Sequence, residues 1–156
     1  MKNLVSRRQL SALIRRLKRR GERIVFTNGV FDILHRGHVD YLSRAKSYGD
    51  VLIVGLNSDA STRRLKGPDR PLQKQNDRAA VLLALRAVNY VVIFGEDTPD
   101  KLIREVRPDV LVKGADYRLS EIVGADFVKS YGGSVRRVPL TRGRSTSRLV
   151  RKLSNG

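Results

Sequence analysis

The chain has only two histidines, His35 and His38, and they stand three residues apart with Gly37 between them. Positions i and i+3 lie on one face of a helical turn, so the two imidazoles would face a common ligand. Gly37 permits close approach of that ligand to the backbone. A helix that begins here favours phosphate through its unpaired N–H groups and its dipole. Two imidazoles could then donate hydrogen bonds to phosphate oxygens as charge develops in a transition state.

Two other interpretations of the histidine pair stay open at this point. A zinc site needs a third and a fourth ligand, and with no cysteine and no further histidine only carboxylates could complete it. Either histidine could also be structural or simply exposed. We expect no metal held by the protein. We favour phosphate chemistry because the pair stands between a predicted strand and a predicted helix.

The elements that must position the pair alternate between short apolar runs and helical segments. The sequence predicts strands at 23–28, 50–59, 90–94, 109–114 and 134–140. It predicts helices at 37–48, 77–88, 99–107, 120–131 and 145–153, and a loop at 63–75. Side chains that could open four of these helices belong to Asn76, Thr98, Ser120 and Ser145.

Such alternation is typical of a parallel sheet covered by helices on both faces. We therefore expect an α/β fold, a Rossmann-like doubly wound sheet of five parallel strands, in a single domain over residues 1–156. Sheets of this kind bind ligands at the C-terminal ends of their strands, near the topological switch point. Those ends carry Asn28-Gly29, Asn57, Gly95, Lys113-Gly114 and Thr141-Arg142.

The N-terminal segment predicts a basic amphipathic helix at residues 4–19. Its apolar positions, Leu10, Leu13, Ile14 and Leu17, follow helical spacing, and Lys and Arg occupy the other face. A membrane-surface helix or a calmodulin-target helix would show the same pattern. We favour a helix, within residues 1–20, that packs on the domain and leaves its basic face in solvent.

The composition narrows the class of protein. A chain of 156 residues with 40% hydrophobic residues is long enough for one buried core. The lack of cysteine excludes disulfide and thiolate chemistry and is compatible with a cytoplasmic protein. The sequence has no apolar run of transmembrane length and no signal-peptide core, so we expect no membrane insertion.

The net charge of +17 comes from the two ends of the chain. Residues 1–20 and 127–156 each hold eight Lys or Arg and no acid, whereas residues 21–126 hold 16 basic and 15 acidic residues. A nucleic-acid or membrane surface, attraction of nucleotides, or a general arginine bias would each explain this asymmetry. The sequence has no helix-turn-helix, RRM or KH motif and only 6% aromatic residues, so we do not expect a nucleic-acid partner.

The stretch GVFDILHRGH, residues 29–38, fits the pattern G-x-F-D-x-x-H-x-G-H. Through it the chain resembles the cytidylyltransferase-like nucleotidyltransferases. The H-x-G-H of class I aminoacyl-tRNA synthetases matches less well, because the chain lacks their K-M-S-K-S element. Two further segments, KGPDRPLQKQNDRAAVLLAL and PDVLVKGADY, resemble the branch that adenylylates D-glycero-D-manno-heptose 1-phosphate. Many bacteria fuse this activity to a sugar-kinase half, and the resemblance here implies a stand-alone transferase.

The resemblance implies transfer of AMP from ATP to a sugar 1-phosphate, which gives ADP-heptose and pyrophosphate for lipopolysaccharide core synthesis. Glycerol-3-phosphate cytidylyltransferases and FAD-synthetase-like adenylyltransferases share the H-x-G-H and remain alternatives. Because the nucleophile is already an anion, no strong general base is required. ATP would bring Mg²⁺ held largely by its own phosphates. A small enzyme of this kind is expected to form a homodimer or a higher homo-oligomer.

The resemblance also assigns roles to individual residues. Catalysis falls to His35, His38 and Lys46, with the Lys46 side chain reaching back along its helix to a phosphate. Nucleotide contacts fall to Thr27, Asn28, Gly29, Phe31, Gly37, Lys113, Gly114, Asp116, Arg144, Ser145, Thr146 and Ser147. Acceptor contacts fall to Asn57, Lys66, Arg70 and Arg78. We expect Asp32 to hold its loop through backbone N–H bonds, as aspartate often does at turns.

Overall fold

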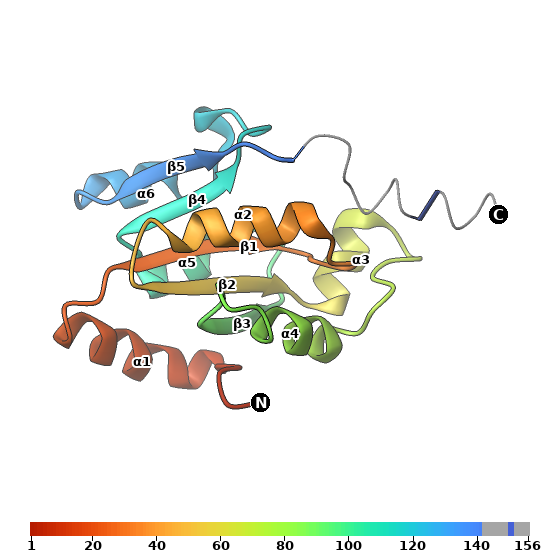
Figure 1. Ribbon diagram of the computed structural model, residues 1–156, viewed down its shortest axis with the longest axis horizontal. Coiled ribbons are helices and arrows are strands. Elements are labelled where there is room, and N and C mark those ends of the chain that lie inside the picture. Colours follow the sequence, from red (N-terminus) through yellow and green to blue (C-terminus); the bar gives the residue numbers. More distant parts are fainter. Residues whose placement is uncertain (142–149, 152–156) are drawn as a thin grey trace.

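A five-stranded parallel sheet forms the centre of the computed structural model, which describes residues 1–141, 150 and 151 (Figure 1). The strand order is β3-β2-β1-β4-β5. The strands are β1 (Ile24–Gly29), β2 (Val51–Asn57), β3 (Tyr90–Phe94), β4 (Val110–Gly114) and β5 (Ser134–Val138). The order reverses between β1 and β4, so the topological switch point lies there. The predicted fold class is therefore confirmed.

Helices cover both faces of the sheet, and α2 crosses in front of β1 while α5 lies behind (Figure 1). The helices are α1 (Arg7–Arg19), α2 (Arg36–Lys46), α3 (Asp59–Lys66), α4 (Gln75–Leu83), α5 (Asp100–Val106) and α6 (Ala125–Ser130), with a 3₁₀ turn η1 (Leu119–Glu121). One apolar cluster joins the sheet to α1, α5 and α6, and a second joins it to α2 and α4. Ile24 and Phe26 of β1 enter the first cluster and Val25 enters the second. Burial on both faces explains the continuous apolar runs in the strands.

Helix α3 was missed by the sequence prediction, which placed the end of a strand at its first residue and a loop across its second half. Its sequence, DASTRRLK, carries a single apolar residue larger than alanine and therefore no apolar stripe. The helix begins because the Ser58 side chain accepts the Ser61 N–H at 3.1 Å. Helix α4 also begins earlier than predicted: Lys74 is its N-cap residue, without a side-chain cap, and Asn76 lies inside the helix.

The predicted helix from Ser120 is interrupted. Gly124, at φ +82°, adopts a left-handed conformation that separates η1 from α6. Helix α5 starts one residue later than predicted, with Pro99 as its N-cap residue, and ends before Pro108 as expected. The predicted helix 145–153 lies largely outside the described residues.

The two edge strands of the sheet, β3 and β5, differ in what lies along their outer sides. At β3, Val91 exchanges backbone hydrogen bonds with Asn3 and Val5 on its outer side. These bonds explain why α1 begins at Arg7 and not at residue 4. At the other edge, among the described residues, β5 pairs with β4 alone, and its Arg136 and Arg137 are exposed.

Helix α1 packs on the sheet through its apolar face. Its four apolar residues, Leu10, Leu13, Ile14 and Leu17, are buried in the first cluster. Arg7 forms ion pairs with Glu105 and, at 3.1 Å, with Glu96. In the part of the chain that the structure describes, no helix has the length and apolar character needed to cross a bilayer.

Replacement of Leu10, which is 1% exposed, tests whether α1 belongs to the core. We expect Leu10→Ala to lower the free energy of unfolding by about 2–5 kcal/mol, because it leaves a cavity between α1 and the sheet. Urea unfolding followed by circular dichroism measures the change. Arg15→Ala on the exposed face of the same helix is the matched control and should change it by less than about 0.5 kcal/mol. Equal losses in both variants would contradict this packing.

Candidate functional site

A cavity of about 590 Å³ opens at the C-terminal edge of the sheet, at the switch point between β1 and β4. Its wall includes twelve of the residues predicted from the sequence: Asn28, Gly29, Phe31, His35, Gly37, His38, Asn57, Lys66, Arg70, Lys113, Gly114 and Asp116. These residues come from the ends of three strands and the loops after two of them, the start of α2, the end of α3 and the segment that follows α3. The fold therefore brings most of the predicted site together in one place. Arg144, Ser145, Thr146 and Ser147 lie outside the described residues.

The histidine pair caps helix α2. His35 is the N-cap residue, and its Nδ1 accepts the Gly37 N–H at 3.1 Å. The Nδ1 of His38 accepts the His35 N–H at 3.4 Å. A neutral imidazole that accepts through Nδ1 carries its proton on Nε2. Both rings line the cavity, so the helix cap fixes each histidine as a donor through Nε2.

The two imidazole rings lie close together, with their centroids 4.0 Å apart. Burial, together with the neighbouring His35, lowers the pKa of His38 to about 4. The Phe31 ring packs edge-on against His38 at 5.4 Å. Phe31 adopts a left-handed backbone conformation, φ 47°, which is rare for a bulky residue and occurs mostly at functional sites. Gly29 leaves the space for this ring, since a Cβ there would come within 2.9 Å of it.

Asp32 connects the histidine loop to the segment after α3. Its carboxylate accepts the backbone N–H groups of Leu72, at 2.9 Å, and Gln73, at 3.0 Å, and it pairs with Nε of Arg70 at 2.8 Å. Burial alone would raise the pKa of Asp32, but the two N–H groups and the Arg70 guanidinium outweigh it and hold the pKa below its ordinary value. The expected backbone N–H bonds are thus present, although they come from a distant segment and not from the local turn.

Arg78 does not face the cavity, and this corrects its predicted role as an acceptor contact. Its side chain is fully buried and donates to the carbonyl groups of Val30, Asn57 and Gln73, at 2.7 to 2.9 Å. It also pairs with Asp59 at 2.7 Å. These bonds engage the donors of the guanidinium and hold together the loops that surround the cavity.

Lys46 and Thr27 are also placed away from the cavity. Lys46 is the last residue of α2, about 12 Å along the helix axis from His38 at 1.5 Å per residue. Its ammonium donates to the Asp50 carbonyl at 2.6 Å, so it closes the C-terminal end of the helix. Thr27 is fully buried, and its hydroxyl bonds the Tyr41 hydroxyl at 2.7 Å. Its part is to support the floor of the cavity through Tyr41, which lines it.

Lys113 brings a positive charge to the β4 side of the cavity. Burial lowers the pKa of Lys113 to about 8, although Asp116 opposes the shift. Its ammonium lies 5.0 Å from the centroid of the Tyr117 ring. Burial disfavours the charged ammonium, and a phosphate bound beside it would favour the charged form again. A Cβ at Gly114 would meet the Asp116 carboxylate, so any other residue at this position requires that carboxylate to move.

Several cavity residues were not predicted from the sequence: Tyr41, Leu65, Asp97, Thr98, Glu121, Val123 and Leu140. Thr98 and Leu140 follow the ends of β3 and β5, so the position of strand ends was a usable signal for them. Tyr41 and Glu121 carry no such signal, because each reaches the cavity only through tertiary packing. Among the described residues, no group of three or more His, Cys, Asp and Glu side chains could hold a metal ion.

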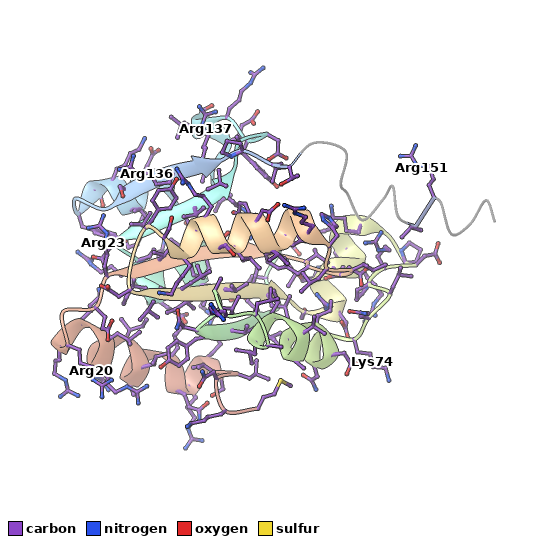
Figure 2. All side chains as sticks on the ribbon, viewed as in Figure 1. Arg20, Arg23, Lys74, Arg136, Arg137 and Arg151 are labelled. Carbon is purple, nitrogen blue, oxygen red and sulfur yellow. The ribbon has the colours of Figure 1, made fainter. Side chains whose placement is uncertain are left out.

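Much of the basic charge lies away from the cavity. Figure 2 shows Arg20, Arg23, Arg136 and Arg137 projecting outward from the periphery of the domain. None of these four residues lines the cavity. Inside it, the cations Lys66, Arg70 and Lys113 stand with the carboxylates of Asp32, Asp97, Asp116 and Glu121. The site is therefore mixed in charge and does not form part of the peripheral basic surface.

Residues 26–142 match the sequence model of the cytidylyltransferase-like family. The bifunctional protein HldE of Geobacter metallireducens is 57% identical over 144 residues, which are 92% of this chain and 29% of that protein. The bifunctional protein HldE of Wolinella succinogenes is 55% identical over 150 residues, or 96% of this chain and 31% of that protein. The chain thus spans less than a third of the length of these relatives.

Two solved structures resemble this chain. The lipopolysaccharide core biosynthesis protein from Thermoplasma volcanium superposes with a TM-score of 0.63 at 32% identity, covering 80% of this chain and 100% of that one. Pantothenate synthetase from Thermus thermophilus superposes with a TM-score of 0.67 at 17% identity, covering 95% of this chain and 67% of that one. The second similarity concerns the fold alone.

The buried position of His38 predicts its titration. We expect its imidazole to titrate near pH 4 and to stay neutral from pH 6 to 8. Because the folded pKa lies below the unfolded value of 6.5, His38 contributes stability that is present above that value and is lost as the pH falls toward 4. NMR titration of the two imidazole Cε1–H signals measures this directly, and His35→Gln assigns them. A His38 midpoint near 6.5 would contradict the buried, Nε2-protonated ring.

Proposed function

The chain belongs to the cytidylyltransferase-like family, and from that membership we propose that it transfers AMP from ATP to a sugar 1-phosphate. The observation that carries the proposal is the pair of Nε2 donors that the α2 cap fixes in the cavity at the switch point. Donors held in place before the reaction stabilise developing charge without a reorganisation cost. The fold and the donors fit a phosphate-transfer reaction that needs no general base.

In the proposed reaction, an oxygen of the acceptor phosphate attacks the α-phosphorus of ATP. A new P–O bond forms, the bond to the bridging oxygen of the β-phosphate breaks, and pyrophosphate leaves with the electron pair. No proton must be removed from the nucleophile. His35 and His38 would donate to the oxygens on the crowded α-phosphorus, and the start of α2 would add its dipole. The chain therefore acts by positioning and by charge neutralisation.

The remaining cavity residues divide between the two substrates. Nucleotide contacts are proposed for Asn28, Gly29, Phe31, Gly37, Lys113, Gly114 and Asp116, and acceptor contacts for Asn57, Lys66 and Arg70. On the resemblance alone, Arg144 with Ser145, Thr146 and Ser147 would bind the β- and γ-phosphates. Lys46 and Arg78 are left out of the proposed contacts because their side chains are engaged elsewhere.

The proposed acceptor is D-glycero-D-manno-heptose 1-phosphate, which would give ADP-heptose for lipopolysaccharide core synthesis. Support comes from the segments at 66–85 and 108–117 that resemble this branch. Further support comes from a 57% identical relative named HldE and a 32% identical relative named for lipopolysaccharide core biosynthesis. A reaction that consumes ATP fits a cytoplasmic enzyme, and magnesium would enter as part of the MgATP substrate. A homo-oligomeric state is also proposed, and light scattering would test it.

Pyrophosphate release tests the substrates. The assay combines ATP or CTP with heptose 1-phosphate or glycerol 3-phosphate, in all four pairs. We expect turnover with ATP and heptose 1-phosphate that exceeds every other pair by at least about tenfold in kcat/KM, which is roughly 1.4 kcal/mol of discrimination. A preference for CTP with glycerol 3-phosphate would contradict the proposed substrates but would still support nucleotidyl transfer as the reaction type. Absence of turnover with all four pairs would overturn the proposal.

Replacement of the histidines tests the chemistry. We expect His35→Ala and His38→Ala each to lower kcat about a hundredfold or more, with a much smaller change in KM for ATP, because each loses a donor to the transition state. Asn and Gln retain a donor and should restore part of the activity. At position 35, the cap geometry predicts different effects for the two replacements. Asn keeps an acceptor for the Gly37 N–H, whereas Gln places its amide nearer the position of Nε2.

His35→Asn should therefore keep the melting temperature, and His35→Gln should recover more of kcat. The matched control is Ser43→Ala, an exposed position on the same helix, which should change neither quantity. An unchanged kcat in both alanine variants would remove the histidines from the chemistry. A collapse of the apo melting temperature with no specific loss of kcat would make them structural.

A further inference from the structure

The carboxylate of Asp32 accepts hydrogen bonds from a single segment, residues 70–73. Oδ1 accepts from Leu72 and Gln73, and Oδ2 accepts from Leu72 and from Nε of Arg70, all at 2.8 to 3.0 Å. The side chain of Asp32 is 1% exposed, so these bonds are shielded from water. A shielded carboxylate that accepts from three N–H groups, one of them shared between its two oxygens, holds its partners in a fixed geometry. Asp32 stands three residues before His35, which places both residues in the same short loop.

Arg70 presents an anion-binding group to the cavity. Its side chain is 22% exposed and lines the cavity, while Nε is held by Asp32. In the described part of the chain, the hydrogen bonds of the Arg70 guanidinium run through Nε alone. The two Nη groups form the fork that binds phosphate through paired N–H bonds. Because Asp32 fixes Nε, it also fixes the direction in which this fork points.

We propose that Asp32 is a positioning residue: it aims the Arg70 guanidinium at the phosphate of the acceptor and ties that anchor to the loop that carries the catalytic histidines. This inference rests on the proposed function and adds the residue that sets the distance between the two reacting phosphates. A single carboxylate connects the acceptor anchor to the α-phosphate donors. A shift of about 1 Å between reacting groups is enough to cost about a hundredfold in rate.

The acceptor fits this anchor better than the nucleotide does. Lys113 supplies a cation on the β4 side of the histidines. Lys66, the last residue of α3, and Arg70, in the segment after it, supply cations from the β2 side of the sheet. Two phosphate groups must meet at the histidines, and each needs its own counter-charge. With the nucleotide on Lys113 and the start of α2, Arg70 is left for the acceptor.

A double-variant cycle tests the inference. Initial rates with ATP and heptose 1-phosphate are measured for the wild type, Asp32→Asn, Arg70→Gln and the double variant. Asparagine keeps one acceptor for the backbone but turns an amide donor toward the Nε–H of Arg70. We expect Asp32→Asn to raise KM for the acceptor about tenfold and KM for ATP less than about twofold. In the Arg70→Gln background, the same substitution should change the acceptor KM by less than about twofold.

The matched control is Asp100→Asn, which breaks another Asp–Arg pair with the same 2.8 Å distance to Nε, outside the cavity. It should leave both KM values unchanged. Should Asp32→Asn fail to fold, Arg70→Lys keeps the charge without the fork, and it should raise the acceptor KM at an unchanged melting temperature. Equal effects of Asp32→Asn in both backgrounds, or a rise in KM for ATP in place of the acceptor, would overturn the inference alone. A wild-type chain without turnover would instead overturn the proposed function.

Discussion

The buried guanidinium of Arg78 is the constraint on which the cavity depends. A charge removed from water costs several kcal/mol unless it is paired and its N–H groups are all bonded. Here three carbonyl groups and the Asp59 carboxylate accept from four of its five N–H groups. The partners come from the loop after β1, the end of β2, the start of α3 and the residues before α4. Because the guanidinium is planar and rigid, these four segments cannot move independently.

This rigidity determines which nitrogen of each histidine carries the proton. An imidazole in a mobile loop would exchange between its two tautomers, and its ring would rotate freely. Here the start of α2 presents backbone N–H groups that need acceptors, and the two Nδ1 atoms supply them. One set of bonds therefore caps a helix and selects the tautomer of both rings. The same contacts stabilise α2 and hold the two Nε2 donors in the cavity. A substitution at His35 therefore affects both the stability of the helix and the donors, unless the new side chain preserves one of the two.

The sequence was sufficient for the sheet because buried strands are continuous apolar runs, and β3 matches its predicted bounds at Tyr90 and Phe94. It was sufficient for half of the residues that line the cavity, because ligand sites in such sheets collect at strand ends. It failed at α3, whose eight residues are held by one serine cap and by packing, without an apolar stripe. It also failed at Arg78 and Lys46. A long basic side chain near a site can reach outward or inward, and only tertiary carbonyl groups decide which.

The two edges of the sheet bear on how the chain behaves in concentrated solution. An open edge strand presents unpaired N–H and carbonyl groups and can recruit the edge of another molecule, which leads to aggregation. At β3 the segment from Asn3 to Val5 occupies that position. At β5, which pairs only with β4 among the described residues, Arg136 and Arg137 are exposed, and charges along an edge strand oppose its pairing with a second copy of itself. Part of the basic excess therefore has a physical consequence at the edge of the sheet that involves no polyanion partner.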